Sequence, residues 1–233
     1  MINKKKYHQM GSYIPISTKE PHSIITEQYR KLRTNIELSD FNQDMKTIAL
    51  TSTFAMEGKT VTSINLATVY AQSGKKTLLI DMDLRKPKIH RGFKKINQIG
   101  LSDMILHNLT VEEAVQVVDD HLHILTSGTK LPYPAEFLMS DKLKELIECL
   151  KGKYDKIIID TPPMTAVTDA NIISSLVDGV VIVFAAREAK IDVASRVIKD
   201  LKDNGANIIG SVMTRVKKKE HHYAYYYYAY GKS

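Results

Sequence analysis

Short apolar runs alternate with helical stretches between residues 46 and 215, and this alternation dominates the chain. It predicts a mostly parallel sheet covered by helices on both faces. Uninterrupted apolar runs such as Ile157 to Ile159 favour strands that are buried on both sides. Strands are predicted over 47–51, 77–80, 122–125, 156–159, 179–185 and 207–213. The fold class is therefore α/β, with three α/β/α layers around a mostly parallel central sheet.

Capping residues mark the ends of the predicted helices. Helices are predicted over 23–38, 59–73 and 189–204. Gly74 and Gly205 follow the last two of these, where a left-handed C-terminal cap favours glycine. Thr110 and Glu113 have the spacing of a capping box, which predicts the start of a further helix.

Two flanks lie outside this pattern. Residues 1–22 form an N-terminal extension and residues 217–233 a low-complexity tail, so 23–216 is expected to be one folded domain. Half of the twelve tyrosines of the chain fall in the tail, namely Tyr223, Tyr225, Tyr226, Tyr227, Tyr228 and Tyr230. The tail lacks the apolar alternation of a strand, and we expect it to be flexible.

Composition indicates the cellular location of the chain more clearly than its function. The longest apolar run, 180–186, is far shorter than the roughly 20 residues that span a membrane. The lysines at 4–6 lead into polar residues rather than a signal sequence, and a single cysteine makes no internal disulfide. A cytoplasmic location is therefore expected. The net charge of +7 suits nucleic acid, an anionic membrane or phosphate ligands, and does not choose among them.

The first predicted strand runs into a loop and then a helix, which is the context of a phosphate-binding loop. Lys59 would reach the β- and γ-phosphates of ATP and Thr60 would bind Mg²⁺, while loop N–H groups hold the anion. The residues expected to line this site are Thr53, Phe54, Ala55, Met56, Glu57, Gly58, Lys59, Thr60 and Val61. An ordinary strand-to-helix turn would also accommodate this sequence.

Three carboxylates follow two other predicted strands. Asp81 and Asp83 come after the second strand, and Asp160 comes after the fourth. The carboxyl ends of parallel strands share one rim, where open α/β sheets bind ligands. Any one of these acids could instead cap a helix or a turn. Their common placement favours a Mg²⁺-nucleotide site in a P-loop NTPase fold.

With these motifs in place, the chain resembles the bacterial tyrosine kinases of capsule and exopolysaccharide synthesis. It is similar to the short cytoplasmic kind that works with a separate membrane adaptor. The resemblance extends from Ser23 onward. It rests on the P-loop Gly58-Lys59-Thr60, the Walker A′ segment Asp81 to Pro87, the Walker B segment Asp160 to Pro163, and the tyrosine-rich end.

The resemblance implies a role for each site residue. Lys59, Asp81, Asp83 and Asp160 would be catalytic, and Thr60, Asp81 and Asp160 would bind the metal. Asp83 would accept the proton of the incoming tyrosine. Phosphoryl transfer depends chiefly on positioning and charge neutralisation, so a carboxylate there need only orient the phenol and take its proton. Arg85 and Thr214 would contact the nucleotide.

The resemblance also implies substrates and partners. The six tail tyrosines would be phosphoacceptors, modified in trans within a ring of identical subunits. Glu27, Arg30 and Arg33 match the ring-assembly pattern of the family, although an intrahelical salt bridge would explain the same spacing. Further expected partners are the cytoplasmic segment of a transmembrane polysaccharide-chain-length adaptor, which would recruit the chain to the inner face of the plasma membrane, and a tyrosine phosphatase. No nucleic acid is expected.

Several residues depart from the expected patterns and keep two alternatives open. Thr53 stands where P-loops generally have glycine, Ala55-Met56 replace Pro-Gly, and Thr214 replaces an asparagine near the adenine. A switch ATPase of the division-site or plasmid-partition type would share the sheet and acids, but Phe54 occupies the place of its signature lysine. A scaffold subunit that binds nucleotide without phosphotransfer would follow from lost backbone freedom at Met56.

Overall fold

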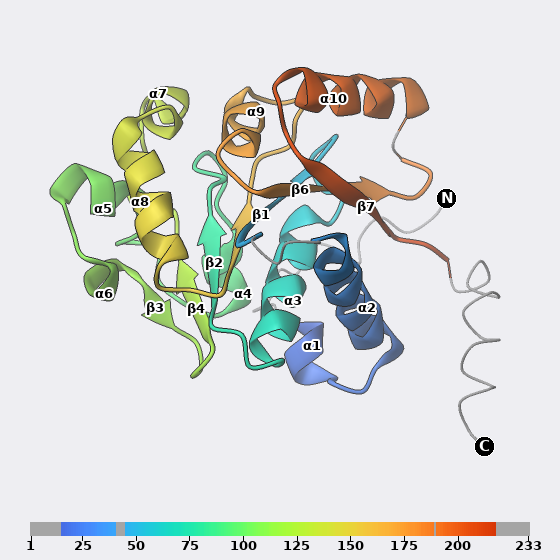
Figure 1. Ribbon diagram of the computed structural model, residues 1–233, viewed down its shortest axis with the longest axis horizontal. Helices are drawn as coiled ribbons and strands as arrows, with labels where there is room; N and C mark the ends of the chain where they lie inside the picture. Colours follow the sequence, from blue (N-terminus) through green and yellow to red (C-terminus); the bar gives the residue numbers. More distant parts are fainter. Residues whose placement is uncertain (1–14, 41–44, 189, 218–233) are drawn as a thin grey trace, which may run out of the picture.

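A seven-stranded sheet forms the centre of the protein (Figure 1), seen in a computed structural model that describes residues 15–40, 45–188 and 190–217. The strands are β1 (Thr47–Ser52), β2 (Thr77–Asp81), β3 (Gln116–Val117), β4 (Leu122–Leu125), β5 (Lys156–Asp160), β6 (Gly179–Ala185) and β7 (Ile208–Thr214). Their order is β3-β4-β2-β5-β1-β6-β7, and only the β3–β4 pair is antiparallel. The six predicted strands and the three-layer α/β class are confirmed. β3 was missed because two residues carry no periodicity.

Helices connect the strands and cover the sheet. They are α1 (Ile16–Lys19), α2 (Ile24–Ser39), α3 (Lys59–Ala71), α4 (Ile89–Gly92), α5 (Leu101–His107), α6 (Val111–Ala114), α7 (Pro134–Leu138), α8 (Asp141–Lys151), α9 (Asp169–Ser174) and α10 (Ile191–Asp203). Gly74 and Gly205 adopt the predicted left-handed conformation, with φ of +82° and +77°. Thr110 donates its N–H to Glu113 at 2.7 Å, as the capping box requires. None of the helices in the described ranges is long and apolar enough to cross a membrane.

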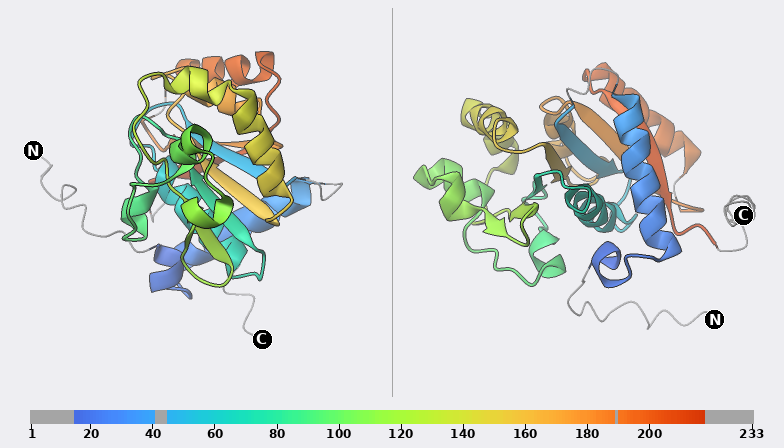
Figure 2. Two further views of the ribbon diagram at one scale, coloured as in Figure 1. Left: turned by 90° about the vertical axis from the view of Figure 1, so that its left-hand side faces the viewer. Right: turned by 60° about the horizontal axis from the view of Figure 1, so that its bottom comes forward.

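Successive residues of each strand point to opposite faces, so the sheet builds two cores. Ile48 and Leu50 of β1 pack with α2, α3 and α4 on one face. Ala49 lies in the other core, to which α5, α8, α9 and α10 contribute. Figure 2 shows the two helical layers with the sheet between them. The continuous apolar runs in the sequence follow from this double burial.

The segment ahead of β1 packs on α3. Ser17 of α1 is buried and donates its N–H to Asn65 at 3.0 Å. Ser23 caps α2 by accepting the N–H of Thr26 at 3.2 Å. Ile36 of α2 lies in the same core as Ile48 and Leu50. Both α1 and α2 therefore belong to the same helical layer as α3.

Asp178 ties three elements together at the amino ends of the strands. Its Oδ2 accepts the N–H groups of Lys46 and Thr47 at 2.9 and 2.8 Å, and its Oδ1 accepts Lys151 Nζ at 2.9 Å. Burial raises the pKa of Asp178, but the hydrogen bonds from Thr47 and Lys151 outweigh burial and hold that pKa below its ordinary value. The charged form of this carboxylate therefore stabilises the starts of β1 and β6.

We expect Asp178→Ala to lower the free energy of unfolding by about 2 to 3 kcal/mol at neutral pH, because hydrogen bonds to a charged group are lost. The folded-state pKa is depressed, so this stabilisation is present above the unfolded carboxyl pKa of about 3.9 and disappears as the pH falls through the folded value. Urea unfolding at about pH 7 and about pH 3 measures both effects. Asp120→Asn, at an exposed position, serves as the control and should change the free energy of unfolding at neither pH.

Candidate active site

The predicted phosphate-binding loop joins β1 to α3 and is closed by the end of β7. Gly58 has φ of +96°, and a Cβ there would lie 3.1 Å from Cγ2 of Thr214. Thr214 also donates its hydroxyl to the carbonyl of Glu57 at 2.6 Å. The left-handed conformation therefore favours glycine at 58, and a Cβ there would be tight against Thr214. Thr214, expected to contact the nucleotide, lies against the loop.

Internal hydrogen bonds fix the loop and leave its N–H groups at the start of α3 available. The buried Glu57 carboxylate accepts the N–H of Phe54 at 2.8 Å, and Thr165 donates its hydroxyl to Thr53 O at 2.6 Å. Within the described ranges, the backbone N–H groups of residues 59–61 donate to no acceptor. A helix N-terminus with free donors binds anions, and phosphate in particular.

The departures from the P-loop pattern have different structural outcomes. Thr53 is fully buried with a negative φ, so glycine is not required at that position. Met56 has φ of +70°, the left-handed region that favours glycine. Its carbonyl accepts a hydrogen bond from Arg215, which also pairs with Glu188. The Met56 backbone is therefore strained and held by a second segment. Phe54, Ala55 and Val61 lie exposed around the loop.

Asp160 is the centre of the site. Its buried carboxylate accepts Lys59 Nζ at 2.6 Å, the Thr60 hydroxyl at 2.7 Å and the Ser63 hydroxyl at 3.0 Å. Ser63 was not predicted from the sequence. Its signal is the spacing of four residues from Lys59, which places both side chains on one face of α3. The P-loop lysine and the Walker B aspartate thus meet as expected from their strands.

Asp81 lies beside Asp160, because β2 and β5 pair in register at these two residues. Asp81 is completely buried, and its Oδ2 accepts the N–H groups of Lys88 and Ile89 at 2.8 and 2.9 Å. Burial, followed by repulsion from Asp160, raises the pKa of Asp81 to about 7, although Lys59 and the N–H donors oppose the rise. Two adjacent buried carboxylates favour a bound cation.

Asp83 and Arg85 lie on the segment after β2. Asp83 Oδ1 accepts the N–H of Lys86 at 3.1 Å, while its Oδ2 accepts no hydrogen bond from the described residues. The guanidinium of Arg85 donates twice to the fully buried Asp169 of α9, at 2.9 and 3.0 Å. Asp169 was not predicted, because an acid at the start of a helix is indistinguishable from a cap in the sequence. The pair fixes the direction of Arg85 beside the site.

The residues present fit a nucleotide with Mg²⁺. No group of three or more His, Cys, Asp or Glu side chains with metal-site geometry exists in the described part of the chain. The predicted set of Thr60, Asp81 and Asp160 supplies two carboxylates and one hydroxyl. Mg²⁺ is commonly held by one or two carboxylates together with phosphates and waters, so this set is sufficient.

The predicted assembly residues lie on α2 with different surroundings. Glu27 and Arg30 form an intrahelical ion pair with side chains 38% and 32% exposed. Arg33 instead donates to the carbonyl of Val69 at 2.9 Å, joining α2 to α3. The tail tyrosines at 223–230 lie outside the described residues.

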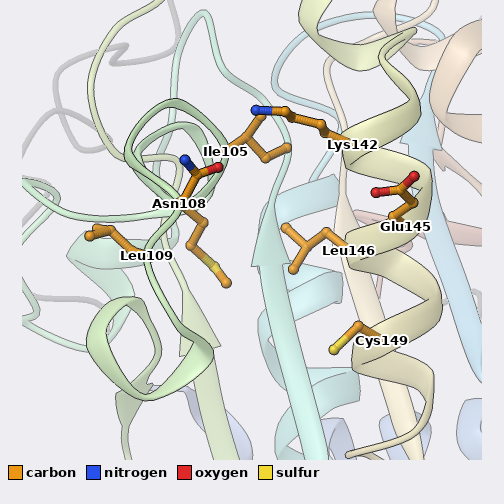
Figure 3. Close-up of a pocket in the computed structure, with 8 residues that line it drawn as sticks. Ile105, Asn108, Leu109, Lys142, Glu145, Leu146 and Cys149 are labelled. Atoms are coloured by element: carbon orange, nitrogen blue, oxygen red, sulfur yellow. The ribbon is translucent and has the colours of Figure 1, made fainter.

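A separate cavity of about 310 Å³ lies between α5 and α8 and shares no residue with this site (Figure 3). Met104, Ile105, Leu109 and Leu146 are the apolar residues of its lining, and Lys142 and Glu145 project from α8. Cys149, the one cysteine of the chain, is exposed on its α8 side. This cavity contains no residue of the phosphate-binding loop and none of the three aspartates.

Comparisons with known proteins show which proteins the chain is similar to. Residues 45–208 match the family described as "AAA domain". Tyrosine-protein kinase YwqD of Bacillus subtilis is 42% identical over 203 residues, which are 87% of this chain and 86% of that protein.

Solved structures give the same result. The crystal structure of the chimerical protein CapA2B2 has a TM-score of 0.84 at 34% identity, covering 90% of this chain and 94% of that one. The kinase domain of Escherichia coli tyrosine kinase ETK has a TM-score of 0.82 at 29% identity, covering 93% and 87%. The septum site-determining protein MinD of Pyrococcus horikoshii, complexed with Mg-ADP, has a TM-score of 0.62 at 25% identity, covering 72% and 69%. The likeness to this septum site-determining protein is therefore weaker.

We expect Met56→Gly to raise the free energy of unfolding by about 0.5 to 1 kcal/mol relative to Met56→Ala, because only glycine relieves the left-handed strain. The greater unfolded-state entropy of glycine limits the gain. Denaturant unfolding of the two variants gives this difference without a contribution from the exposed methionine side chain. If Met56→Gly were less stable than Met56→Ala, as the unfolded-state entropy of glycine alone dictates, the backbone at residue 56 would be unstrained.

Proposed function

The chain belongs to the bacterial tyrosine-protein kinases, and from this premise we propose that it transfers the γ-phosphoryl group of ATP to tyrosines of its own tail in trans. The observation that carries the proposal is the contact of Lys59, Thr60 and Ser63 with one buried carboxylate, Asp160. This cluster lies where free N–H groups at the start of α3 can receive phosphate.

The nucleotide would be held by the loop that β7 closes. Lys59 and the N–H groups of residues 59–61 would receive the β- and γ-phosphates, and Thr214 would contact the nucleotide above Gly58. Thr60, Asp81 and Asp160 would hold Mg²⁺. When bound, the cation neutralises charge on the phosphates and on the two buried carboxylates.

Asp83 is the proposed general base, and Asp81 has a positioning and metal-binding role. Asp81 accepts hydrogen bonds from the N–H of Asp83 with one oxygen and of Lys88 and Ile89 with the other. Oδ2 of Asp83 accepts no hydrogen bond from the described residues and the residue is 9% exposed, so a phenolic O–H would have access to this oxygen. The tyrosine oxygen would attack the γ-phosphorus, the bond to the β-γ bridging oxygen would break, and the phenolic proton would pass to Asp83.

Arg85 would offset negative charge during the transfer. Its bidentate contact with Asp169 uses one edge of the guanidinium, and the side chain remains 41% exposed. The outer N–H groups are therefore accessible to a phosphate oxygen.

The proposed cellular role is regulation of capsule or exopolysaccharide synthesis. The phosphoacceptors would be the six tail tyrosines, and a tyrosine phosphatase would reverse the modification. Glu27 and Arg30 are accessible on α2 for contacts within a ring of subunits, whereas Arg33 also holds α3. The cytoplasmic segment of a transmembrane adaptor would bring the chain to the inner face of the plasma membrane.

A scaffold that binds nucleotide without phosphotransfer is a second candidate function. The left-handed strain at Met56, where the family generally has glycine, is the observation that favours it. The next experiment separates the two functions because it measures nucleotide binding and phosphotransfer independently.

We expect phosphotyrosine to form at residues 223–230 when the chain is incubated with ATP and Mg²⁺, with the adaptor's cytoplasmic segment present. Lys59→Met should lower the rate by about 10²-fold or more, because a charge that stabilises the transferred group is lost. Mass spectrometry maps the sites. Nucleotide binding with unmodified tyrosines, with and without the adaptor segment, would support the scaffold function instead.

Asp83→Asn should lower kcat by about 10²-fold with little change in the KM for ATP, because the proton acceptor is lost but the nucleotide contacts remain. Asp81→Asn should instead raise the Mg²⁺ concentration needed for half-maximal rate. Initial rates at varied ATP and varied Mg²⁺ separate the two effects. If Asp83→Asn retained full kcat, the assignment of the base would be wrong.

A further inference from the structure

A basic run follows the candidate base. Residues 85–95 contain Arg85, Lys86, Lys88, Arg91, Lys94 and Lys95 and no acidic residue. Arg85 is paired with Asp169, but the other five form no ion pair with any described residue. In a chain with a net charge of +7, this run is a local concentration of unneutralised cations.

The site acids hold the backbone of this run in place. Lys86 donates its N–H to Asp83 at 3.1 Å, and Lys88 donates its N–H to Asp81 at 2.8 Å. The side chains of Lys86, Arg91 and Lys94 are exposed, whereas Lys95 Nζ donates to Val117 O at 2.9 Å. The backbone of Lys86 and Lys88 is therefore fixed beside the site acids, while the side chains of Lys86, Arg91 and Lys94 are exposed to solvent.

The tail changes the sign of its charge when it is phosphorylated. Residues 218–233 carry three lysines and one glutamate, so the unmodified tail is repelled by the basic run. Each phosphotyrosine adds about −1.5 to −2 charges at neutral pH. Two phosphates are therefore enough to make the tail anionic. Attraction to the run would begin only after the first transfers.

The tail is long enough to reach the run. β7 ends at Thr214 beside the P-loop, and β2 lies four strands away in the sheet. Four strand spacings amount to about 19 Å. The 16 residues beyond 217 span up to roughly 50 Å when extended. This length exceeds the distance from the end of β7 to β2 within one subunit.

We propose that Lys86, Lys88, Arg91 and Lys94 form a docking surface for the phosphorylated tail of this chain. The surface holds phosphotyrosines already made, so that the next tyrosine of the tail is presented to Asp83. This proposal rests on the proposed autokinase function, because it requires a phosphorylated tail. Guanidinium and ammonium groups bind phosphate by charge-assisted hydrogen bonds. An unphosphorylated tyrosine of the tail cannot make these contacts.

The test uses the full chain without nucleotide and a fluorescent peptide of residues 220–233 carrying phosphate on Tyr225 and Tyr227. We expect fluorescence anisotropy at about 0.15 M ionic strength to show binding at least about tenfold tighter than for the unphosphorylated peptide. The double variant Arg91→Glu and Lys94→Glu should lose that advantage. Thermal unfolding confirms that the variant is folded.

The matched control is Lys142→Glu with Lys144→Glu on α8, where both side chains are exposed. It changes the net charge by the same amount and should keep phosphopeptide affinity within about threefold. An equal loss in both double variants would reduce the effect to overall charge and overturn the proposal.

A second arm distinguishes the tail from a membrane surface. Vesicles of phosphatidylcholine with and without phosphatidylserine replace the peptide, and cosedimentation is measured. Vesicle binding that needs Arg91 and Lys94, without phosphopeptide binding, would assign the run to lipid and overturn tail docking. The synthetic peptide makes the outcome independent of kinase activity, so an inactive chain would still bind it if the docking surface exists.

Discussion

Two carboxylates, Asp81 and Asp160, lie side by side at the rim of the sheet, and the site depends on how their charge is compensated. Parallel pairing of β2 and β5 places them in register, and both are almost completely buried. Lys59 supplies one positive charge at 2.6 Å from Asp160. The second carboxylate has only backbone N–H donors, and its pKa is raised to about 7. A divalent cation is the natural complement of this arrangement.

The parts of the site that the sequence predicts are those that secondary structure alone brings together. Asp81 and Asp160 end two buried parallel strands and Lys59 follows a third, and the carboxyl ends of such strands share one rim. Ser63 and Asp169 could not be identified with the same certainty. Ser63 resembles any helical serine in the sequence, and the contact of Asp169 with Arg85 depends on how α9 packs. Contacts between segments 84 residues apart leave no local pattern.

Backbone conformation at the phosphate-binding loop is likewise predictable from the sequence only in part. The sequence indicates that methionine at 56 loses the freedom of glycine, and the structure places that residue at φ of +70°. The sequence does not indicate that Arg215, beyond β7, donates to the carbonyl of Met56. It also cannot indicate that Gly58 is packed against Thr214. Local strain is therefore predictable at this loop, whereas the tertiary contacts that hold it are not.

The same acids that shape the catalytic centre also fix the cations around it. Asp81 and Asp83 accept N–H groups from Lys88 and Lys86, so the backbone at the start of the basic segment is tied to both carboxylates. Attraction between this segment and a phosphorylated tail is exposed to solvent and screened over about 8 Å at physiological ionic strength. The Lys59–Asp160 contact is buried and is screened much less. Rising salt should therefore weaken binding of the phosphorylated tail to the basic segment before it disturbs the phosphate site. The number of phosphates added to each chain should then fall with salt, whereas the rate of the first transfer should change little.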